Sequence, residues 1–301
     1  MINKLSLSSL RIVFRIENIF KNILIFLPLL LSERIATTDD LLILGSGFLI
    51  FSIMTSICYS TNDYTDKKKD IINKLKVNKI VLDKNIIIFL NFFLFLFLIY
   101  LYQFTHLFNF YLVVYLFYFY FYNFFAKSFF LIDIIFLTSF YIIRIFYGSE
   151  LIDLDISYWF LFFFISLFLI FSIFKRMIQI SVNNLKSKKN KIINYSFNDY
   201  PFLKKIVIFA TILNFSTFFL YLYEISYPNT FTSLSAPETR YEQSILLLGL
   251  IFIGYWFGLI RVINLVFNKK IKQDIYIFAL KDKINYIFLI IYLLFAYFHI
   301  G

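Results

Sequence analysis

Apolar residues form runs of membrane-spanning length along almost the whole chain. A run of roughly 17 to 25 apolar residues is long enough for one helix to cross the hydrocarbon core of a bilayer. The pattern predicts nine such helices, at residues 18–33, 41–60, 85–104, 107–125, 129–148, 157–176, 203–223, 243–265 and 284–300. Residues 1–17 carry three basic side chains among scattered apolar ones and are expected to lie along the membrane surface. We therefore expect an all-α polytopic membrane protein with a single domain over residues 1–301.

Basic residues gather in alternate connections between these runs. With the N-terminus inside, 26 of the 29 Lys and Arg residues fall on the cytoplasmic side, in residues 1–21, 63–84, 127, 175–205 and 261–283. Cytoplasmic loops of membrane proteins carry an excess of Lys and Arg. The pattern predicts a membrane protein with a cytoplasmic N-terminus and an external C-terminus.

Composition excludes several classes of protein. Hydrophobic residues make up 61% of the chain, which is too apolar for a soluble globular domain or a disordered segment. The net charge of +11 follows the predicted topology, so no nucleic-acid partner is expected. A single cysteine, Cys58, excludes an intrachain disulfide, and two histidines far apart in sequence do not suggest a metal centre.

The most chemically distinctive stretch is Asn62 to Asp70, directly after the second apolar run. On a helix, Asp63, Asp66 and Asp70 would fall within an arc of about 60°. Three carboxylates on one face repel each other unless a cation lies among them, and Mg²⁺ is commonly bound by carboxylates together with substrate phosphates. The stretch predicts a Mg²⁺-diphosphate site at the membrane surface, with Asn62 assisting. The alternative is a solvated loop neutralised by Lys67, Lys68 and Lys69.

Other polar side chains on the same predicted side could bind phosphate groups. Lysine and arginine are the usual protein partners of phosphate. The candidates are Lys76, Lys79, Asn123, Lys127, Lys175, Arg176 and Arg261. For Lys175 and Arg176, charges that only fix topology at a helix end are an equally good explanation.

Two ionisable residues fall inside the fifth run. Asp133 and Arg144 are 11 positions apart, which places them on nearly the same helix face. Charges within a membrane span usually face the bundle interior or a wet cavity. We expect a functional role for Asp133 near the cytoplasmic end, while Arg144 is as well explained by a structural role.

The stretch Asn62 to Asp70 resembles the first Asp-rich motif of the UbiA-type polyprenyl transferase superfamily. More of the chain is similar to one branch, the decaprenyl-phosphate phosphoribosyltransferases. The matching positions are Arg15, Asn18, Lys21, Asn22, Pro28, Lys76, Lys79, Tyr122, Lys127, Asp133, Arg144, Gly148, Lys175, Arg176, Arg261, Asp274 and Asp282. The chain departs from the branch at Asn73-Lys74, where His-Pro is usual, and at Gln179, where an acid is usual. Residues 175–198 contain no acid, so the second Asp-rich motif of prenyl-diphosphate enzymes is missing, which favours the phosphoribosyl branch.

The resemblance implies a UbiA-like bundle of nine helices around a cytoplasm-facing cavity. It implies Mg²⁺-dependent transfer of a phosphoribosyl group from phosphoribosyl pyrophosphate to a polyprenyl phosphate, with release of diphosphate, to make a cell wall glycan precursor. The implied catalytic residues are Asp63, Asp66, Asp70 and Asp133, and Lys21 joins the substrate-binding set with Asn62. The protein is expected to lie among the lipids of a bacterial inner (plasma) membrane. Whether it forms an oligomer is left open.

Two alternatives remain open at this point. The first is an enzyme of the same fold that uses a polyprenyl diphosphate donor and an aromatic or lipid acceptor. The second is a membrane protein without enzymatic activity, such as a lipid or anion transporter. A transporter is expected to carry ionisable residues at span centres next to Gly or Pro breaks, and the chain has few of these.

Overall fold

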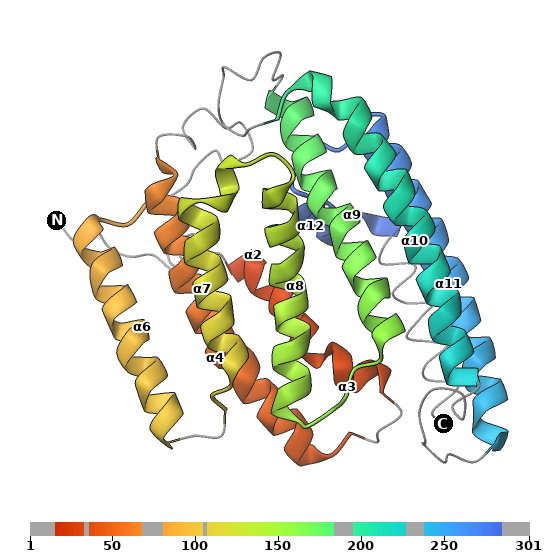
Figure 1. Ribbon diagram of the computed structural model, residues 1–301, viewed down its shortest axis with the longest axis horizontal. Helices are drawn as coiled ribbons and strands as arrows, with labels where there is room; N and C mark the ends of the chain where they lie inside the picture. The colour runs from red at the N-terminus through yellow and green to blue at the C-terminus, as the bar shows by residue number, and fades with distance from the viewer. Residues whose placement is uncertain are drawn as a thin grey trace. The chain divides into compact units, whose positions relative to one another are not determined.

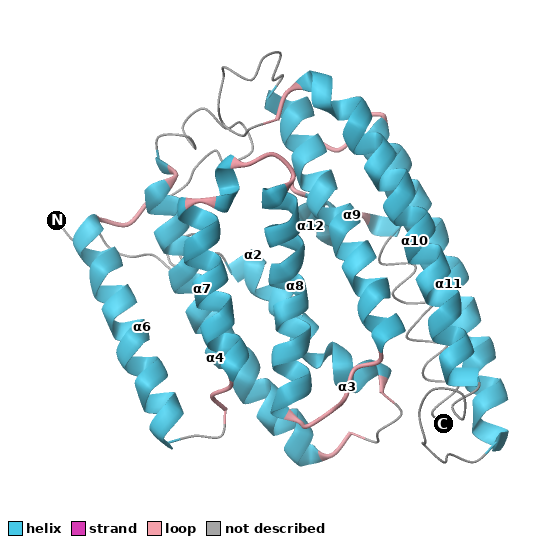
Figure 2. Ribbon diagram, viewed as in Figure 1, coloured by secondary structure: helices cyan, strands magenta, loops and turns pink. Residues whose placement is uncertain are grey.

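The computed structural model describes residues 16–32, 36–67, 81–104, 107–183, 195–226 and 238–284 (Figure 1). Within those ranges all regular structure is helical, and no strand occurs (Figure 2). The all-α prediction is therefore confirmed for the described part of the chain. The helices are α2 (Ile16–Ile19), η1 (Phe20–Phe26), α3 (Leu27–Leu31), α4 (Thr38–Thr65), α6 (Lys84–Phe104), α7 (Phe110–Phe124), η3 (Ala126–Ser128), α8 (Ile132–Leu151), α9 (Tyr158–Asn183), η4 (Phe197–Asp199), α10 (Tyr200–Ser226), α11 (Glu238–Phe267) and α12 (Ile275–Lys281).

Eight of the nine predicted apolar runs coincide with these helices. The ninth, 284–300, lies outside the described residues except for its first position. Among the described residues, five helices are long and apolar enough to cross a membrane, and three further apolar helices are shorter. The five are Thr38–Thr65, Lys84–Gln103, Ile132–Leu151, Tyr158–Asn183 and Phe197–Glu224. Helix α12 was not predicted, because its seven residues are too few to show an apolar run of spanning length.

The first apolar run is not one regular α-helix. It begins as α2, tightens into the 3₁₀ helix η1 and returns to α-geometry in α3. Pro28, near the start of α3, has no N–H to donate to the carbonyl of Leu24, which instead accepts from Leu27 in the 3₁₀ pattern. The proline therefore accounts for the 3₁₀ bond at the end of η1.

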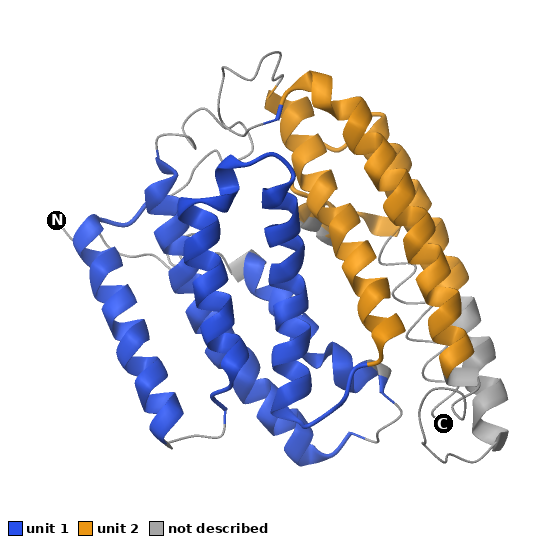
Figure 3. Cartoon of the chain, viewed as in Figure 1, with its two compact units in different colours: residues 1–156, 187–195 blue, residues 157–186, 196–301 orange. Residues whose placement is uncertain are grey.

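The chain divides into two compact units (Figure 3). Unit 1 comprises residues 1–156 and 187–195, and unit 2 comprises residues 157–186 and 196–301. In unit 1, α8 packs against η1, α3, α4 and α7, and α4 also packs against α6. In unit 2, α10 packs against α9 and α11, and α12 packs against α9. The expectation of one domain over residues 1–301 stays a prediction.

Helix α4 carries the beginning of the Asp-rich stretch. It starts with a capping box, in which Thr37 Oγ1 accepts from the Asp40 N–H and the Asp40 carboxylate accepts from the Thr37 N–H. It continues beyond the predicted end of the second run and stops only at Thr65, with Asp66 as its C-cap. Buried hydroxyls along it, such as those of Ser56 and Ser60, donate to carbonyls one turn earlier, so these polar groups find acceptors within the helix itself.

Candidate functional site

The start of the Asp-rich stretch is the buried end of a helix. Asn62 and Asp63 lie in the last turn of α4, and the Asp66 N–H donates to the Asn62 carbonyl at 3.0 Å. Asp63 is 4% exposed and Asp66 is 6% exposed. The alternative of a solvated loop is therefore wrong for these two carboxylates. The helix extends into the stretch, and the two carboxylates lie on its buried side.

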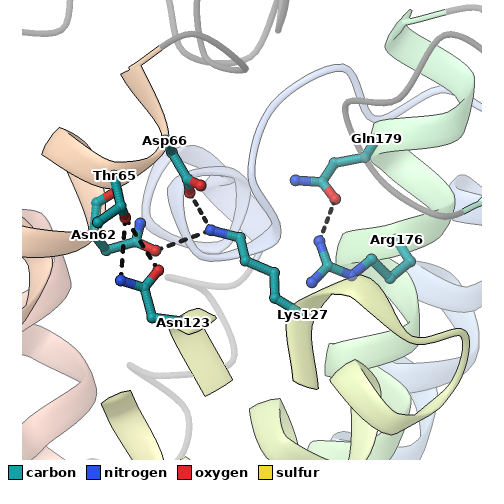
Figure 4. A network of polar contacts seen from close by, with 7 residues as sticks. All are labelled: Asn62, Thr65, Asp66, Asn123, Lys127, Arg176 and Gln179. Atoms are coloured by element: carbon teal, nitrogen blue, oxygen red, sulfur yellow. Dashed lines mark hydrogen bonds and ion pairs between the residues drawn. The ribbon is translucent and has the colours of Figure 1, made fainter. Parts of the chain in front are cut away.

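Lys127 brings an ammonium group to this helix end from a distant part of the chain. It lies in η3, directly after α7, and its Nζ donates to Asn62 Oδ1 at 3.0 Å (Figure 4). The same Nζ forms an ion pair with Asp66 Oδ2. The ammonium also lies 6.0 Å from the centre of the Tyr122 ring. Three residues predicted from sequence, Asn62, Asp66 and Lys127, are thus brought together.

Asn123 ties the same two helix ends by a separate contact. Its Nδ2 donates to Thr65 Oγ1 at 3.1 Å, and Thr65 also donates to the Asn62 carbonyl at 3.0 Å (Figure 4). Thr65 was not predicted, because a threonine beside a charged stretch carries no distinctive signal. The ends of α4 and α7 are therefore joined by one charged contact and one neutral contact.

Asp133 lies in the first turn of α8, where it is 1% exposed and accepts a hydrogen bond from the Tyr195 hydroxyl. That hydroxyl also accepts from the Leu131 N–H at 2.9 Å. Leu131 has φ 64°, in the left-handed region that a leucine rarely adopts. Tyr195 thus holds both the carboxylate and the strained turn before it. Sequence reasoning missed Tyr195, since it is one of 23 tyrosines with no motif around it.

Two predicted phosphate binders of unit 2, Arg176 and Arg261, have partners within that unit. Arg176, on α9, is 3% exposed and donates to Gln179 Oε1 at 2.6 Å (Figure 4). Arg261, on α11, forms a two-point ion pair with Asp282, with Nη2 to Oδ1 at 3.2 Å. Asp282, one of the positions that match the phosphoribosyltransferase branch, is therefore the ion-pair partner of another such position. Lys175 is half-buried on α9.

The remaining predicted residues fall in two groups. Lys21 lies half-buried in η1 and has an interaction partner. Asp70, Lys76 and Lys79 lie outside the described residues, so their positions stay predictions.

Arg144 is the centre of a buried polar network in unit 1 that spacing alone did not reveal. It is 1% exposed, and its Nε donates to Asn22 Oδ1 at 2.8 Å. Its Nη2 donates to Tyr115 at 3.2 Å and to Tyr59 at 3.4 Å, while Nη1 donates to the Phe140 carbonyl. Asn22 in turn donates to Ser52 at 3.0 Å and Thr55 at 3.1 Å. The partners that the structure gives this guanidinium are all uncharged.

The donor set at the end of α4 suits a hard cation. Amide and carboxylate oxygens are the ligands that Mg²⁺ prefers. Asn62 Oδ1 and Asp66 Oδ2 already converge on one cation, the ammonium of Lys127, and Asp63 lies on the same helix end. Among the described residues, no group of three His, Cys, Asp or Glu side chains could hold a metal ion, and Asp70 lies outside that part of the chain.

A scan of the chain against protein-family models and a search of curated proteins each found no match. The resemblance to the UbiA-type superfamily therefore stays a hypothesis supported by the residues themselves.

Proposed function

We propose that this protein is a Mg²⁺-dependent integral membrane transferase of the UbiA type. It moves a phosphoribosyl group from phosphoribosyl pyrophosphate to a polyprenyl phosphate and releases diphosphate. Nine helices form a bundle around a cytoplasm-facing cavity in a bacterial inner membrane, with the N-terminus inside and the C-terminus outside. The observation that supports this proposal most directly is the convergence of Asn62, Asp66 and Lys127 at the end of a long apolar helix.

The side chains at this helix end have the charges that the reaction requires. The reaction forms a bond between a phosphate oxygen of the lipid and the ribosyl C1, and it breaks the bond between C1 and the diphosphate, which leaves with the electron pair. Mg²⁺ held by Asp63, Asp66 and Asp70 would supply positive charge to the leaving diphosphate. Lys127 supplies a further positive charge beside Asp66 and can bind and orient a phosphate group.

The acceptor requires little help from the protein. A polyprenyl phosphate is already anionic at neutral pH, so its oxygen needs no strong general base. Asp133 is held in one orientation by Tyr195, which suits a role in positioning rather than in proton transfer. The long apolar helices provide the lipid-facing surface along which a polyprenyl chain would lie. Lys21, Lys76, Lys79, Asn123, Lys175, Arg176 and Arg261 complete the proposed binding set.

The test is a transfer assay with purified full-length protein. Phosphoribosyl pyrophosphate labelled in the ribosyl group is incubated with Mg²⁺ and a polyprenyl phosphate, and label is counted in the organic extract, with EDTA as a control. We expect metal-dependent label in the lipid phase. No transfer from this donor, together with consumption of labelled polyprenyl diphosphate in the presence of an aromatic acceptor, would instead indicate the prenyltransferase alternative.

A matched pair of variants tests the proposed metal ligands. Asp66→Asn keeps the shape of a buried side chain and removes its charge, so we expect turnover to fall about 100-fold or more. Asp39→Asn makes the same chemical change at the exposed first turn of the same helix and should leave turnover near the wild-type value. Size-exclusion profiles of both variants check folding. Near-normal turnover of folded Asp66→Asn would contradict the metal assignment.

A further inference from the structure

The ammonium of Lys127 lies where a cation bound by Asn62 and Asp66 would lie. Nζ is 3.0 Å from Asn62 Oδ1 and is ion-paired with Asp66 Oδ2, whose side chain is only 8% exposed. A buried carboxylate without a counter-charge is costly, because the interior solvates charge poorly. Lys127 therefore neutralises Asp66 in the protein without ligand.

A metal ion cannot simply be added to this arrangement. A metal ion on Asn62 and Asp66 would lie close to the Lys127 ammonium that these side chains now contact, and two cations so close together repel each other. A Mg²⁺ ion that arrives without an anion would have to displace the ammonium from Asp66, and the ion pair with Asp66 would be lost. A Mg²⁺ ion that arrives with a diphosphate brings a new anionic partner for the ammonium.

The position of Lys127 allows such an exchange. Its side chain is 20% exposed and extends from the short helix η3, at the water-accessible edge of the helix end. Lysine has a long, flexible stem and a point charge, so its ammonium can change partners without moving the backbone. The separate bond between Asn123 and Thr65 would keep the ends of α4 and α7 together while Lys127 moves.

We propose that Lys127 is an exchangeable counter-ion. It neutralises Asp66 until the donor arrives and then transfers its ammonium to the diphosphate, so the metal is taken up as its diphosphate complex and only weakly as the free ion. This inference rests on the proposed function, and it goes further by coupling metal binding to diphosphate binding through one named residue.

The test measures binding, not turnover. Mn²⁺ binding to the purified full-length protein is followed by the electron paramagnetic resonance signal of the free ion. Binding of labelled inorganic diphosphate is measured by equilibrium dialysis with and without Mn²⁺. The proteins compared are the wild type, Lys127→Met and Asp66→Asn, with Lys84→Met as the control, because Lys84 is exposed at the start of α6 and its loss changes the charge equally.

We expect Lys127→Met to bind Mn²⁺ alone about tenfold more tightly than the wild type, and its metal-dependent diphosphate binding to weaken by a similar factor. Lys127→Gln, whose amide can still donate to Asp66, should behave in the same way if Lys127→Met fails to fold. Lys84→Met should match the wild type.

The outcomes separate this inference from the proposed function. One outcome is that Asp66→Asn abolishes Mn²⁺ binding, while the wild type and the Lys127 variants bind Mn²⁺ equally well. This result overturns the exchange and leaves the metal site intact. The other outcome is that the wild type and the Lys127 variants bind no more Mn²⁺ than Asp66→Asn does, with or without diphosphate. This result overturns the metal site on which both proposals rest.

Discussion

At the scale of single residues, Arg144 shows how unit 1 accommodates a charge inside an apolar segment. A guanidinium in such surroundings needs a partner for each of its donors. Here an asparagine, two tyrosines and a backbone carbonyl accept its hydrogen bonds. The rings of Tyr115 and Phe51 lie 5.1 and 5.4 Å from its central carbon, at distances typical of cation–π contacts. These contacts connect η1, α4, α7 and α8, so the network is structural in its effect.

Asn22→Ala should destabilise the protein, because it removes an acceptor of Arg144 and the donor to Ser52 and Thr55. We expect a loss of about 1–2 kcal/mol in unfolding free energy. Ile23→Ala, at an exposed position of the same short helix, is the control and should have a smaller effect. Unfolding by SDS in mixed micelles measures both, and equal losses in the two variants would show that the network contributes little.

At the scale of elements, the close approach of α8 to η1 depends on the absence of a side chain. A Cβ on Gly148 would lie 1.9 Å from the carbonyl oxygen of Ile25. Backbone atoms cannot move aside as the end of a flexible side chain can, so only glycine fits. Ile25 lies in the 3₁₀ segment just before Pro28. The close packing of α8 on this segment therefore requires both the backbone geometry around Ile25 and a glycine at position 148.

Gly148→Ala should force α8 and η1 apart and lower the unfolding free energy by about 1–3 kcal/mol. Gly45→Ala is the matched control, since a Cβ there meets nothing within 4 Å. Alanine is the better helix former, so Gly45→Ala should be neutral or slightly stabilising. Thermal unfolding in detergent distinguishes the two, and a stable Gly148→Ala protein would contradict the close contact.

At the scale of the whole molecule, the orientation in the membrane follows from the loop charges. The basic connections are expected on the cytoplasmic side, including the one after α7 that contains Lys127. Helix α8 is one of the five helices long enough to span. Its two ends are therefore expected on opposite sides of the membrane.

Single cysteines introduced on a Cys58→Ser background test this orientation. Ser128 and Asp155 are both exposed and flank α8 on either side. A membrane-impermeant maleimide should label Asp155→Cys from outside intact spheroplasts and Ser128→Cys only in inverted vesicles. If one side of the membrane gives access to both positions, α8 does not cross as expected.

The helices themselves could be predicted from the sequence. A long apolar run is a local property of the chain, and in lipid a helix satisfies all its backbone hydrogen bonds within itself. The same reasoning set the end of the second run too early, because Ser60, Thr61 and Asn62 are polar in sequence. Their side chains nevertheless bond within the bundle, so α4 continues to Thr65.

The amino-acid sequence by itself determined the all-α class, the number of apolar runs within the described residues and the identity of Asn62, Asp66 and Lys127 as candidates. Only the tertiary structure decided which side chains meet. Lys127 contacts Asp66 across 61 positions, Tyr195 contacts Asp133 across 62, and Arg144 contacts Asn22 across 122. Such contacts depend on how helices far apart in sequence pack together, and hydrophobic patterns along the chain carry no information about that pairing.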